Sequence, residues 1–215
     1  MRNGTFIFAI VAIAGIVFGD EPRPFDHDLE DAEVGKLPLG WISDKTGNGQ
    51  KGIWRVLEDE SAPRGPKVLA QVSPSPKYLF NLCLIDNSIF LNGEISVAFK
   101  ALGGENDQGG GIVWRYVDSN NYYLARVNPL ESNFRLYKVV AGRRIQIATK
   151  EGVNCAANEW HTLTIHHLDT EIVCLLDGEK HLEATDTMYK KPGKVGLWTK
   201  SDAQTFFDGL TSSPN

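Results

Sequence analysis

The sequence is short of the residues that build disulfide scaffolds. Its 215 residues include only three cysteines, and none of these has the C-x-x-C spacing of a metal or redox site. After residue 20 the sequence has no long apolar run and no sustained helical periodicity. We therefore expect neither a membrane-spanning helix nor a helical bundle in that part of the chain. These absences favour a β-rich globular fold.

The three cysteines lie far apart along the chain. Cys83 and Cys174 sit inside apolar runs, which predicts buried core thiols. Export would permit a disulfide, but three thiols cannot all pair within one chain. A bridge between Cys155 and Cys174 therefore stays open as an alternative to free thiols.

Residues 1–19 have the pattern of a secretory signal peptide. Arg2 precedes an apolar stretch from Phe6 to Phe18, and Gly19 is small enough for a signal peptidase site. The stretch is shorter than the roughly 20 apolar residues that span a membrane. We therefore expect cleavage near Gly19, export to the periplasm or the cell exterior, and no transmembrane span after cleavage.

Residues 20–215 have a length that suits a single domain, since β-sandwiches often reach about 200–250 residues. Arg2 is the only charged residue before Asp20, so this part holds 21 basic and 27 acidic residues, a net charge of −6. Because the net charge is negative, we do not expect this part of the chain to bind nucleic acid. Residues 112–150 nevertheless hold seven basic residues against two acidic ones. Such a segment forms either a solvated basic face or a face that meets an anion or a polar sugar.

Short runs rich in β-branched and aromatic residues follow one another from residue 24 to residue 210. Turn residues separate them at short intervals, which is typical of a β-sandwich or barrel. Ala141-Gly142 and Asp177-Gly178 are the clearest hairpin turns, because glycine accepts a positive φ. The pattern predicts fourteen strands in two packed sheets of six or seven. It predicts an irregular loop along the sandwich edge for residues 30–51.

Alternation along these strands divides their side chains between two faces. In residues 121–128, Tyr123 and Val127 suit the core, and Arg126 then points outward. In residues 112–116, the same rule buries Tyr116 and turns Arg115 outward.

The rule places a set of aromatic, basic and amide side chains on one outward face. The set is Arg115, Tyr122, Arg126, Asn128, Arg135, Tyr137 and Trp198. A pyranose needs such a surface, because its C–H face packs on an aromatic ring while its hydroxyls bond polar groups.

Several phrases of the sequence are similar to one family. They include Trp54-Arg55-Val56, Asp107-Gln108-Gly109-Gly110-Gly111-Ile112-Val113-Trp114-Arg115-Tyr116, Trp160-His161-Thr162-Leu163 and Gly193-Lys194-Val195-Gly196-Leu197-Trp198-Thr199-Lys200. From about Phe25 to Leu210 the chain resembles the bacterial 3-keto-disaccharide hydrolases, also called 3-keto-glucoside lyases and hydratases. The resemblance implies an all-β fold, a two-sheet antiparallel jelly-roll sandwich of the concanavalin A-like, laminin G-like kind.

The resemblance also bears on the two ends of the sequence. In such folds the first and last strands lie side by side, and the segments around Asp26 and Asp208 fit that pairing. These two carboxylates would then come close enough to hold a structural calcium ion, a hard cation that takes oxygen ligands. The alternative is a pair of exposed or hydrogen-bonded edge carboxylates. No other cofactor is indicated.

Such proteins are often grouped with glycoside hydrolase family 16, whose strand motif is E-x-D-x-x-E. The chain lacks the complete motif, and it also lacks G-x-S-x-G, H-x-H and H-E-x-x-H arrangements. A retaining hydrolase needs two carboxyl groups about 5–5.5 Å apart. We therefore do not expect that mechanism.

A lyase that acts on a 3-keto sugar needs fewer groups. The ketone acidifies the neighbouring C2 proton, so one base and one group that stabilises the enolate can suffice. The candidate bases are Glu131, His161 and Asp107, and the candidate stabilisers are Arg126, Arg115 and Lys200. Each has a structural alternative, namely an ion-paired carboxylate or arginine, or a hydrogen-bonded histidine at the start of a strand.

Three functional hypotheses follow. The first is an exported hydrolase or lyase that cleaves or hydrates 3-keto-glycosides, with Glu131, His161 and Arg126 as catalytic residues. The second is a non-catalytic, lectin-like glycan-binding module of the same fold. The third is an adhesion or scaffold domain with a protein partner. In the first two the partner is a carbohydrate, and its binding residues would be Gln108, Arg115, Tyr122, Asn128, Arg135, Tyr137, Trp198 and Lys200.

Overall fold

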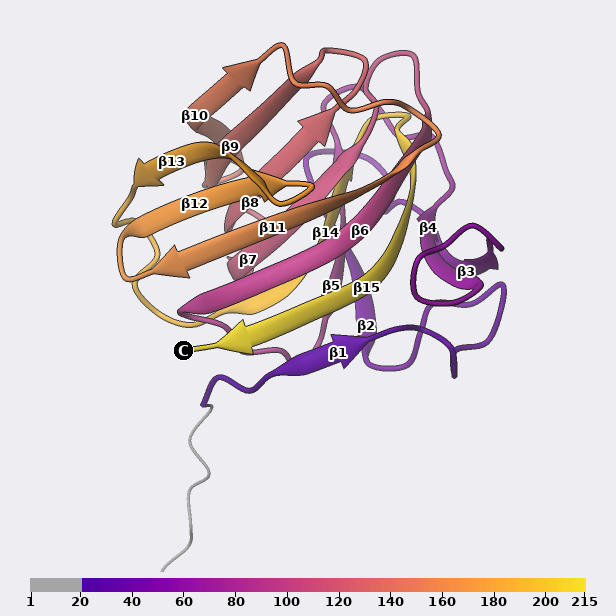
Figure 1. Cartoon of the computed structure of the whole chain (residues 1–215), viewed down its shortest axis with the longest axis horizontal. Coiled ribbons are helices and arrows are strands. Elements are labelled where there is room, and N and C mark those ends of the chain that lie inside the picture. Colours follow the sequence, from indigo (N-terminus) through magenta and orange to yellow (C-terminus); the bar gives the residue numbers. More distant parts are fainter. Residues whose placement is uncertain (1–20) are drawn as a thin grey trace, which may run out of the picture.

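The computed structural model describes residues 21–215, so the expected signal peptide lies outside the described residues. The described residues form fifteen strands and no helix, arranged in two antiparallel sheets (Figure 1). No helix that could cross a membrane occurs between residues 21 and 215. The all-β, two-sheet architecture expected from the sequence is confirmed.

One sheet has eight strands. They are β1 (Phe25–His27), β3 (Trp54–Glu58), β4 (Lys67–Gln71), β6 (Gly93–Gly103), β11 (Trp160–Leu168), β12 (Glu171–Leu176), β13 (Glu179–Thr185) and β15 (Gln204–Pro214). Their order is β13-β12-β11-β6-β15-β4-β3, and β1 pairs with β15. The first and last strands therefore lie side by side, with Phe25 opposite Ser212 and His27 opposite Leu210.

The other sheet has seven strands. They are β2 (Trp41–Thr46), β5 (Phe80–Ile85), β7 (Gly110–Asp118), β8 (Asn121–Asn128), β9 (Asn133–Val140), β10 (Arg143–Glu151) and β14 (Lys194–Lys200). Their order is β10-β9-β8-β7-β14-β5-β2. The expectation of an irregular loop over residues 30–51 is wrong for β2, which pairs with β5 along its whole length. The polar composition of these residues resembles that of a loop, but Trp41 and Thr46 of β2 are buried.

The main core lies between the two sheets. Tyr123, Ala125 and Val127 point into it, as alternation along β8 predicts. Cys83, Cys155 and Cys174 are also buried there, and all three are free thiols, so the Cys155–Cys174 bridge does not form. Burial raises the pKa of the Cys155 thiol to about 12, which keeps it protonated and unreactive.

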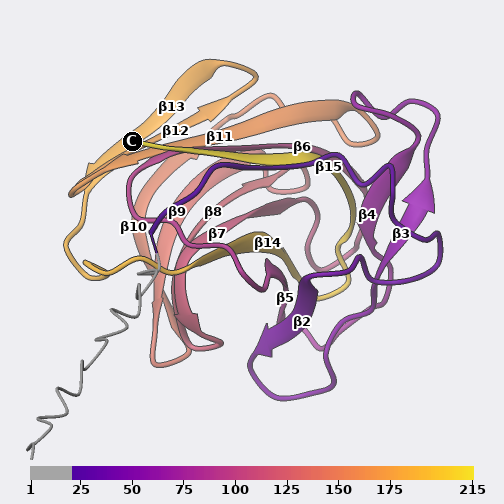
Figure 2. The same cartoon turned by 90° about the horizontal axis from the view of Figure 1, so that it is seen from below.

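A second apolar cluster covers the other face of the seven-stranded sheet, which we call the concave face. Its buried members are Phe80, Leu82, Leu84, Val113, Tyr116, Tyr122, Leu124, Tyr137, Val139 and Trp198. Among residues 21–215, no second sheet packs on this face. The sheet instead curls (Figure 2). The two sides of the curl are tied together where the Thr46 hydroxyl bonds Ser119 O and Tyr122 Oη.

The curl is deep enough for one side chain to bridge it. Arg144 on β10 lies over the rings of Tyr137 on β9 and Phe80 on β5, with its Cζ 4.4 Å and 5.1 Å from the two ring centres. β10 and β5 are five spacings apart in the strand order, about 24 Å in a flat sheet at about 4.8 Å per spacing. The concave face is therefore folded on itself, and Arg144 covers part of its aromatic floor.

Close backbone approach at Gly196 provides a test of this packing. A Cβ at Gly196 would lie 2.2 Å from the carbonyl oxygen of Cys83, whereas a Cβ at Gly103 would meet nothing within 4 Å. We expect Gly196→Ala to lower the free energy of unfolding by about 2–3 kcal/mol, because β5 would have to move away from β14. Gly103→Ala is the matched control and should change it by less than about 0.5 kcal/mol. Equal effects of the two substitutions in urea unfolding would contradict this packing.

Candidate functional site

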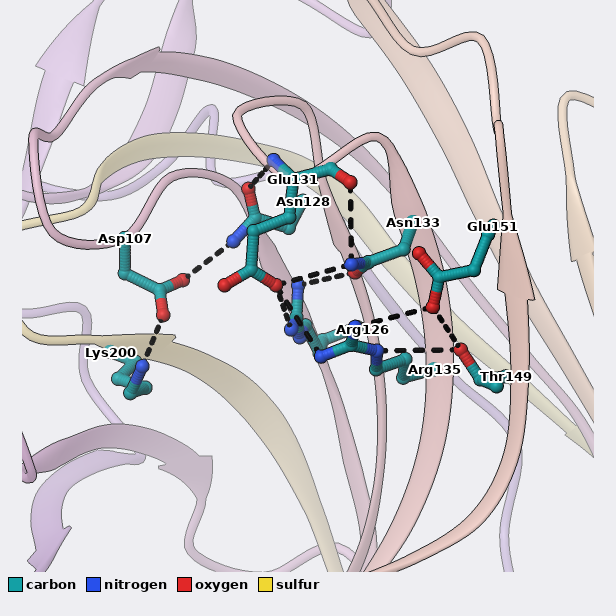
Figure 3. Close-up of polar contacts among 9 residues, drawn as sticks. All are labelled: Asp107, Arg126, Asn128, Glu131, Asn133, Arg135, Thr149, Glu151 and Lys200. Carbon is teal, nitrogen blue, oxygen red and sulfur yellow. Dashed lines mark hydrogen bonds and ion pairs between the residues drawn. The ribbon is translucent and has the colours of Figure 1, made fainter.

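A cluster of hydrogen-bonded polar residues occupies one end of the concave face. We call it the polar cluster, and its members are Asp107, Arg126, Asn128, Glu131, Asn133, Arg135, Thr149, Glu151 and Lys200 (Figure 3). Strand register brings its centre together, because Arg126 lies opposite Arg135 and Asn128 lies opposite Asn133 in the β8–β9 pair. Residues opposite each other in a ladder point to the same face.

Glu131 joins the two arginines. It lies in the turn between β8 and β9, and its Oε2 accepts hydrogen bonds from Arg126 Nη2 at 2.8 Å and Arg135 Nη1 at 3.4 Å. Asn133 donates to the same oxygen at 3.2 Å and accepts a bond from Arg126 Nη1 at 2.9 Å. Arg126 is 1% exposed, so Glu131 is the counter-charge of a buried guanidinium.

This pairing governs the ionisation of Glu131. Burial opposes the charged form, but the hydrogen bonds from Arg126 and Asn133 and the nearby positive charges outweigh it and lower the pKa of Glu131 to about 2. A carboxylate of such low basicity is a poor acceptor of a carbon-bound proton near neutral pH. The arrangement suits a fixed hydrogen-bond acceptor better than a general base.

Arg135 extends the cluster to β10. Its Nε donates to Thr149 Oγ1 at 3.3 Å, and its Nη2 donates to Glu151 Oε1 at 3.2 Å. The register of β10 shifts between Gln146 and Ala148, which turns Thr149 and Glu151 onto the face occupied by Arg144. Simple alternation would place them on the opposite face, so no pattern in the sequence points to these two residues.

Asp107 and Lys200 form the other side of the cluster. Lys200 Nζ donates to Asp107 Oδ2 at 2.5 Å, and Asn128 Nδ2 donates to Asp107 Oδ1 at 3.1 Å. Asp107 is 1% exposed. Gln108 follows it in the same loop.

The loop that carries Asp107 is held by Asp202. The Asp202 carboxylate accepts backbone N–H bonds from Glu105, Asn106 and Asp107. Burial opposes its ionisation, but these bonds prevail and lower its pKa to about 2. Asp202 thus positions Asp107.

The aromatic candidates lie on the concave face as alternation predicts, but they are not open to solvent. Tyr122 and Trp198 are 0% exposed and Tyr137 is 4% exposed. The curl of the sheet and the Arg144 side chain cover them. The expectation of an exposed aromatic platform is therefore wrong, although the assignment of these residues to this face is right.

Arg115 does not lie on the concave face. It has a φ of +45° and stands at a shift in the β7 register, so the side chains beyond it change sides and Tyr116 joins the concave face instead of the core. The Arg115 guanidinium donates to the backbone carbonyls of Leu91, Tyr189 and Asp169. It ties three loops together away from the polar cluster.

His161 lies in the other sheet. At the start of β11, its Nδ1 bonds Asp177 Oδ2 at 2.7 Å and its Nε2 bonds Ala156 O at 3.2 Å. The structure therefore does not bring His161 together with Glu131 and Arg126.

Asp26 is paired with a guanidinium, whereas Asp208 has one bonded oxygen and one, Oδ1, that is buried without a partner. Arg64 Nη1 donates to Asp26 at 2.6 Å, and the Arg64 backbone N–H donates to Asp208 Oδ2 at 2.8 Å. A guanidinium thus stands beside these carboxylates where a calcium ion would supply positive charge. Among the described residues no group of three or more His, Cys, Asp or Glu side chains could hold a metal ion. The guanidinium contact to Asp26 favours paired edge carboxylates over a calcium ion shared by the two residues.

The sequence matches no family model, and no curated protein matches it. Solved structures do match over most of the chain. The carbohydrate-binding module CBM66 from Bacillus subtilis is 19% identical to this chain and has a TM-score of 0.65. The match covers 81% of this chain and 96% of the module. The β-glucanase of Bacillus licheniformis is 14% identical and has a TM-score of 0.59. The match covers 89% of this chain and 98% of the β-glucanase chain.

A third structure extends this likeness. A glycoside hydrolase family 16 endo-glucanase from Bacteroides ovatus, in complex with G4G3G-2F-DNP, is 9% identical and has a TM-score of 0.61. The match covers 88% of this chain and 99% of the endo-glucanase chain. At these identities the likeness is one of fold. The chain thus has the concanavalin A-like jelly roll that carbohydrate-binding modules and family 16 glycoside hydrolases share.

The ionisation of Glu131 makes the stability of the fold depend on pH. Its pKa in the folded protein is about 2, below the ordinary value of 4.5, so its stabilising effect is complete above about pH 4.5 and is lost as the pH falls towards 2. Glu131→Gln should therefore be less stable than the wild type at pH 7. The difference in free energy of unfolding should shrink between pH 4.5 and pH 2.5, as measured by urea unfolding.

The exposed Glu171 on β12 provides a control for this measurement, and Glu171→Gln should match the wild type at every pH. A gap between wild type and Glu131→Gln that does not change with pH would show that the charge of Glu131 is not what stabilises Arg126.

Proposed function

We propose that the chain is a carbohydrate-active protein that binds a glycan against the polar cluster of the concave face. The polar cluster itself is the observation that supports this most. It presents charged donors and acceptors in fixed positions, and several remain accessible. The exposed side-chain fractions are 39% for Glu131, 26% for Arg135 and 59% for Glu151.

Such a surface suits sugar hydroxyls. Carboxylate oxygens accept bonds from hydroxyl hydrogens, arginine donates to hydroxyl oxygens, and hydrogen bonds to charged groups are the stronger ones. The network holds these groups in place before a ligand arrives, which lowers the entropic cost of binding. The fold shared with a carbohydrate-binding module adds support by analogy.

We favour binding without catalysis as the function of this face. Glu131 is a weak base with a pKa of about 2, and His161 lies in the other sheet. Of the three candidate bases, Asp107 is left, and it is buried behind Lys200. The expected export through residues 1–19 and the single domain over residues 20–215 belong to this proposal, since an exported module would meet glycans outside the cytoplasm.

The Asp107–Lys200 pair favours an enzyme as the second candidate. In a 3-keto-glycoside, Asp107 would take the C2 proton and Lys200 would stabilise the enolate oxygen. Collapse of the enolate would then break the C1–O bond, with the proton held by Asp107 passing to the departing oxygen so that the aglycone leaves as an alcohol, and water would add across the resulting C1–C2 double bond. The resemblance of the sequence to 3-keto-disaccharide hydrolases points to this reaction class.

Binding and turnover can be measured on the same protein. We expect isothermal titration against a panel of oligosaccharides to find at least one ligand, and we expect Arg135→Gln to weaken it at least tenfold through the loss of the Glu131 and Glu151 contacts. Thr162→Ala changes an exposed residue of β11 in the other sheet and should leave affinity unchanged. Failure of every oligosaccharide to bind would overturn the proposal.

Incubation with 3-keto-disaccharides, followed by NMR, separates the two candidates. Binding without product formation supports the binding module. Product formation that Asp107→Asn removes, with affinity retained, would establish the enzyme instead.

A further inference from the structure

The basic residues of the concave face differ in how their charge is balanced. Arg126 and Arg135 pair with Glu131, and Lys200 pairs with Asp107. Within residues 21–215, Arg144 forms no ion pair and its guanidinium donates no hydrogen bond, and its Nη1 is buried without a partner. Arg144 is thus the cation of this face that lacks an anion.

Arg144 also has a fixed position. Its Cζ lies 4.4 Å from the ring centre of Tyr137, 5.1 Å from that of Phe80 and 5.8 Å from that of Trp198. Three rings from three strands therefore hold the guanidinium across the curl by cation–π contact. Its side chain retains partial exposure, so a ligand can reach part of it.

A second donor on the same face is also unsatisfied. Arg126 Nε is buried without a hydrogen-bond partner. Burial lowers the pKa of Arg144 and the charge of Arg126 acts in the same direction, whereas Tyr137, Asp107 and Glu131 act in the opposite direction. An anion beside Arg144 would give its N–H groups an acceptor and offset the charge of Arg126, since a charged donor without a partner is costly in a buried position.

Cation–π contact with three rings accounts for the position of the Arg144 guanidinium, but it leaves Nη1 without an acceptor. A methionine or lysine stem would cover the same rings without leaving an unpaired planar donor fork. The fork matches the geometry of a carboxylate or a sulfate, each of which it can bind through two parallel N–H bonds. The glutamates and amides beside it would then take the hydroxyls of the same sugar ring.

We propose that the glycan bound by the concave face carries an anionic substituent, a ring carboxylate or a sulfate ester, and that Arg144 is the residue that selects it. The inference rests on the proposed glycan-binding function and adds the substrate class. Neutral sugars would leave the Arg144 fork unpaired and would bind more weakly.

The test compares matched ligands by isothermal titration. The panel contains oligomers of glucuronic, galacturonic and mannuronic acid, sulfated oligosaccharides, and the neutral counterpart of each backbone. We expect the tightest ligand to be anionic and to bind at least tenfold tighter than its neutral counterpart. The separate carboxylate and sulfate ligands show which group Arg144 takes.

Three variants assign the preference to Arg144. Arg144→Met keeps the apolar stem, and it should weaken the anionic ligand at least tenfold while changing the neutral one less than twofold. Arg144→Lys keeps the charge without the fork and should give an intermediate loss. The exposed neighbour Arg143 is the matched control, and Arg143→Gln should change neither ligand by more than twofold.

Two results would overturn the inference. A neutral oligosaccharide that binds as tightly as its anionic counterpart, or a preference that survives in both Arg144 variants with unchanged melting temperature, would remove Arg144 as the selecting residue. Either result leaves glycan binding intact. Failure of every ligand in the panel would overturn the proposed function together with this inference.

Discussion

A buried positive charge organises the open end of the concave face. The Arg126 guanidinium is almost wholly withdrawn from water, and a charge in that position must have partners close by. Glu131 supplies the counter-charge because the turn between β8 and β9 directs it back over the sheet, and Asn133 completes the geometry from the next strand. Arg135 and Glu151 continue the network outward to β10.

The same constraint explains why a carboxylate at this position is unsuited to proton abstraction. The arginines that hold Glu131 in place also stabilise its negative charge, and this removes its basicity. Rigidity and basicity are therefore opposed at this residue. A glycan-binding surface requires the first property, and an enolate-forming enzyme would require the second.

Alternation was sufficient to predict most of the concave face. It placed Arg126, Arg135 and Trp198 correctly, because β8, β9 and the end of β14 keep regular register. It fails at Arg115, where one extra residue of β7 relative to β14 reverses the side chains that follow. The shift after Gln146 likewise turns Thr149 and Glu151 onto the concave face. Nothing local in the sequence marks these two shifts.

The burial of the aromatic side chains had a different cause. The strand pattern shows on which face a residue lies, but not how strongly the sheet curls, and the curl is what closes the face around Tyr122 and Trp198. The strand β2 was missed for a related reason. Its polar residues resemble a loop in isolation, and only pairing with β5 and the tie from Thr46 to the far side of the curl give it an ordered place.

The position of β15 has a consequence for how the protein assembles. It is the last strand in chain order, yet it lies inside the eight-stranded sheet, paired with β6 on one side and with β4 and β1 on the other (Figure 1). Without residues 204–214 in place, these neighbours have unpaired edges and the sheet is split in two. The eight-stranded sheet therefore closes only when β15 is in place, and a chain without it exposes strand edges that other chains could join.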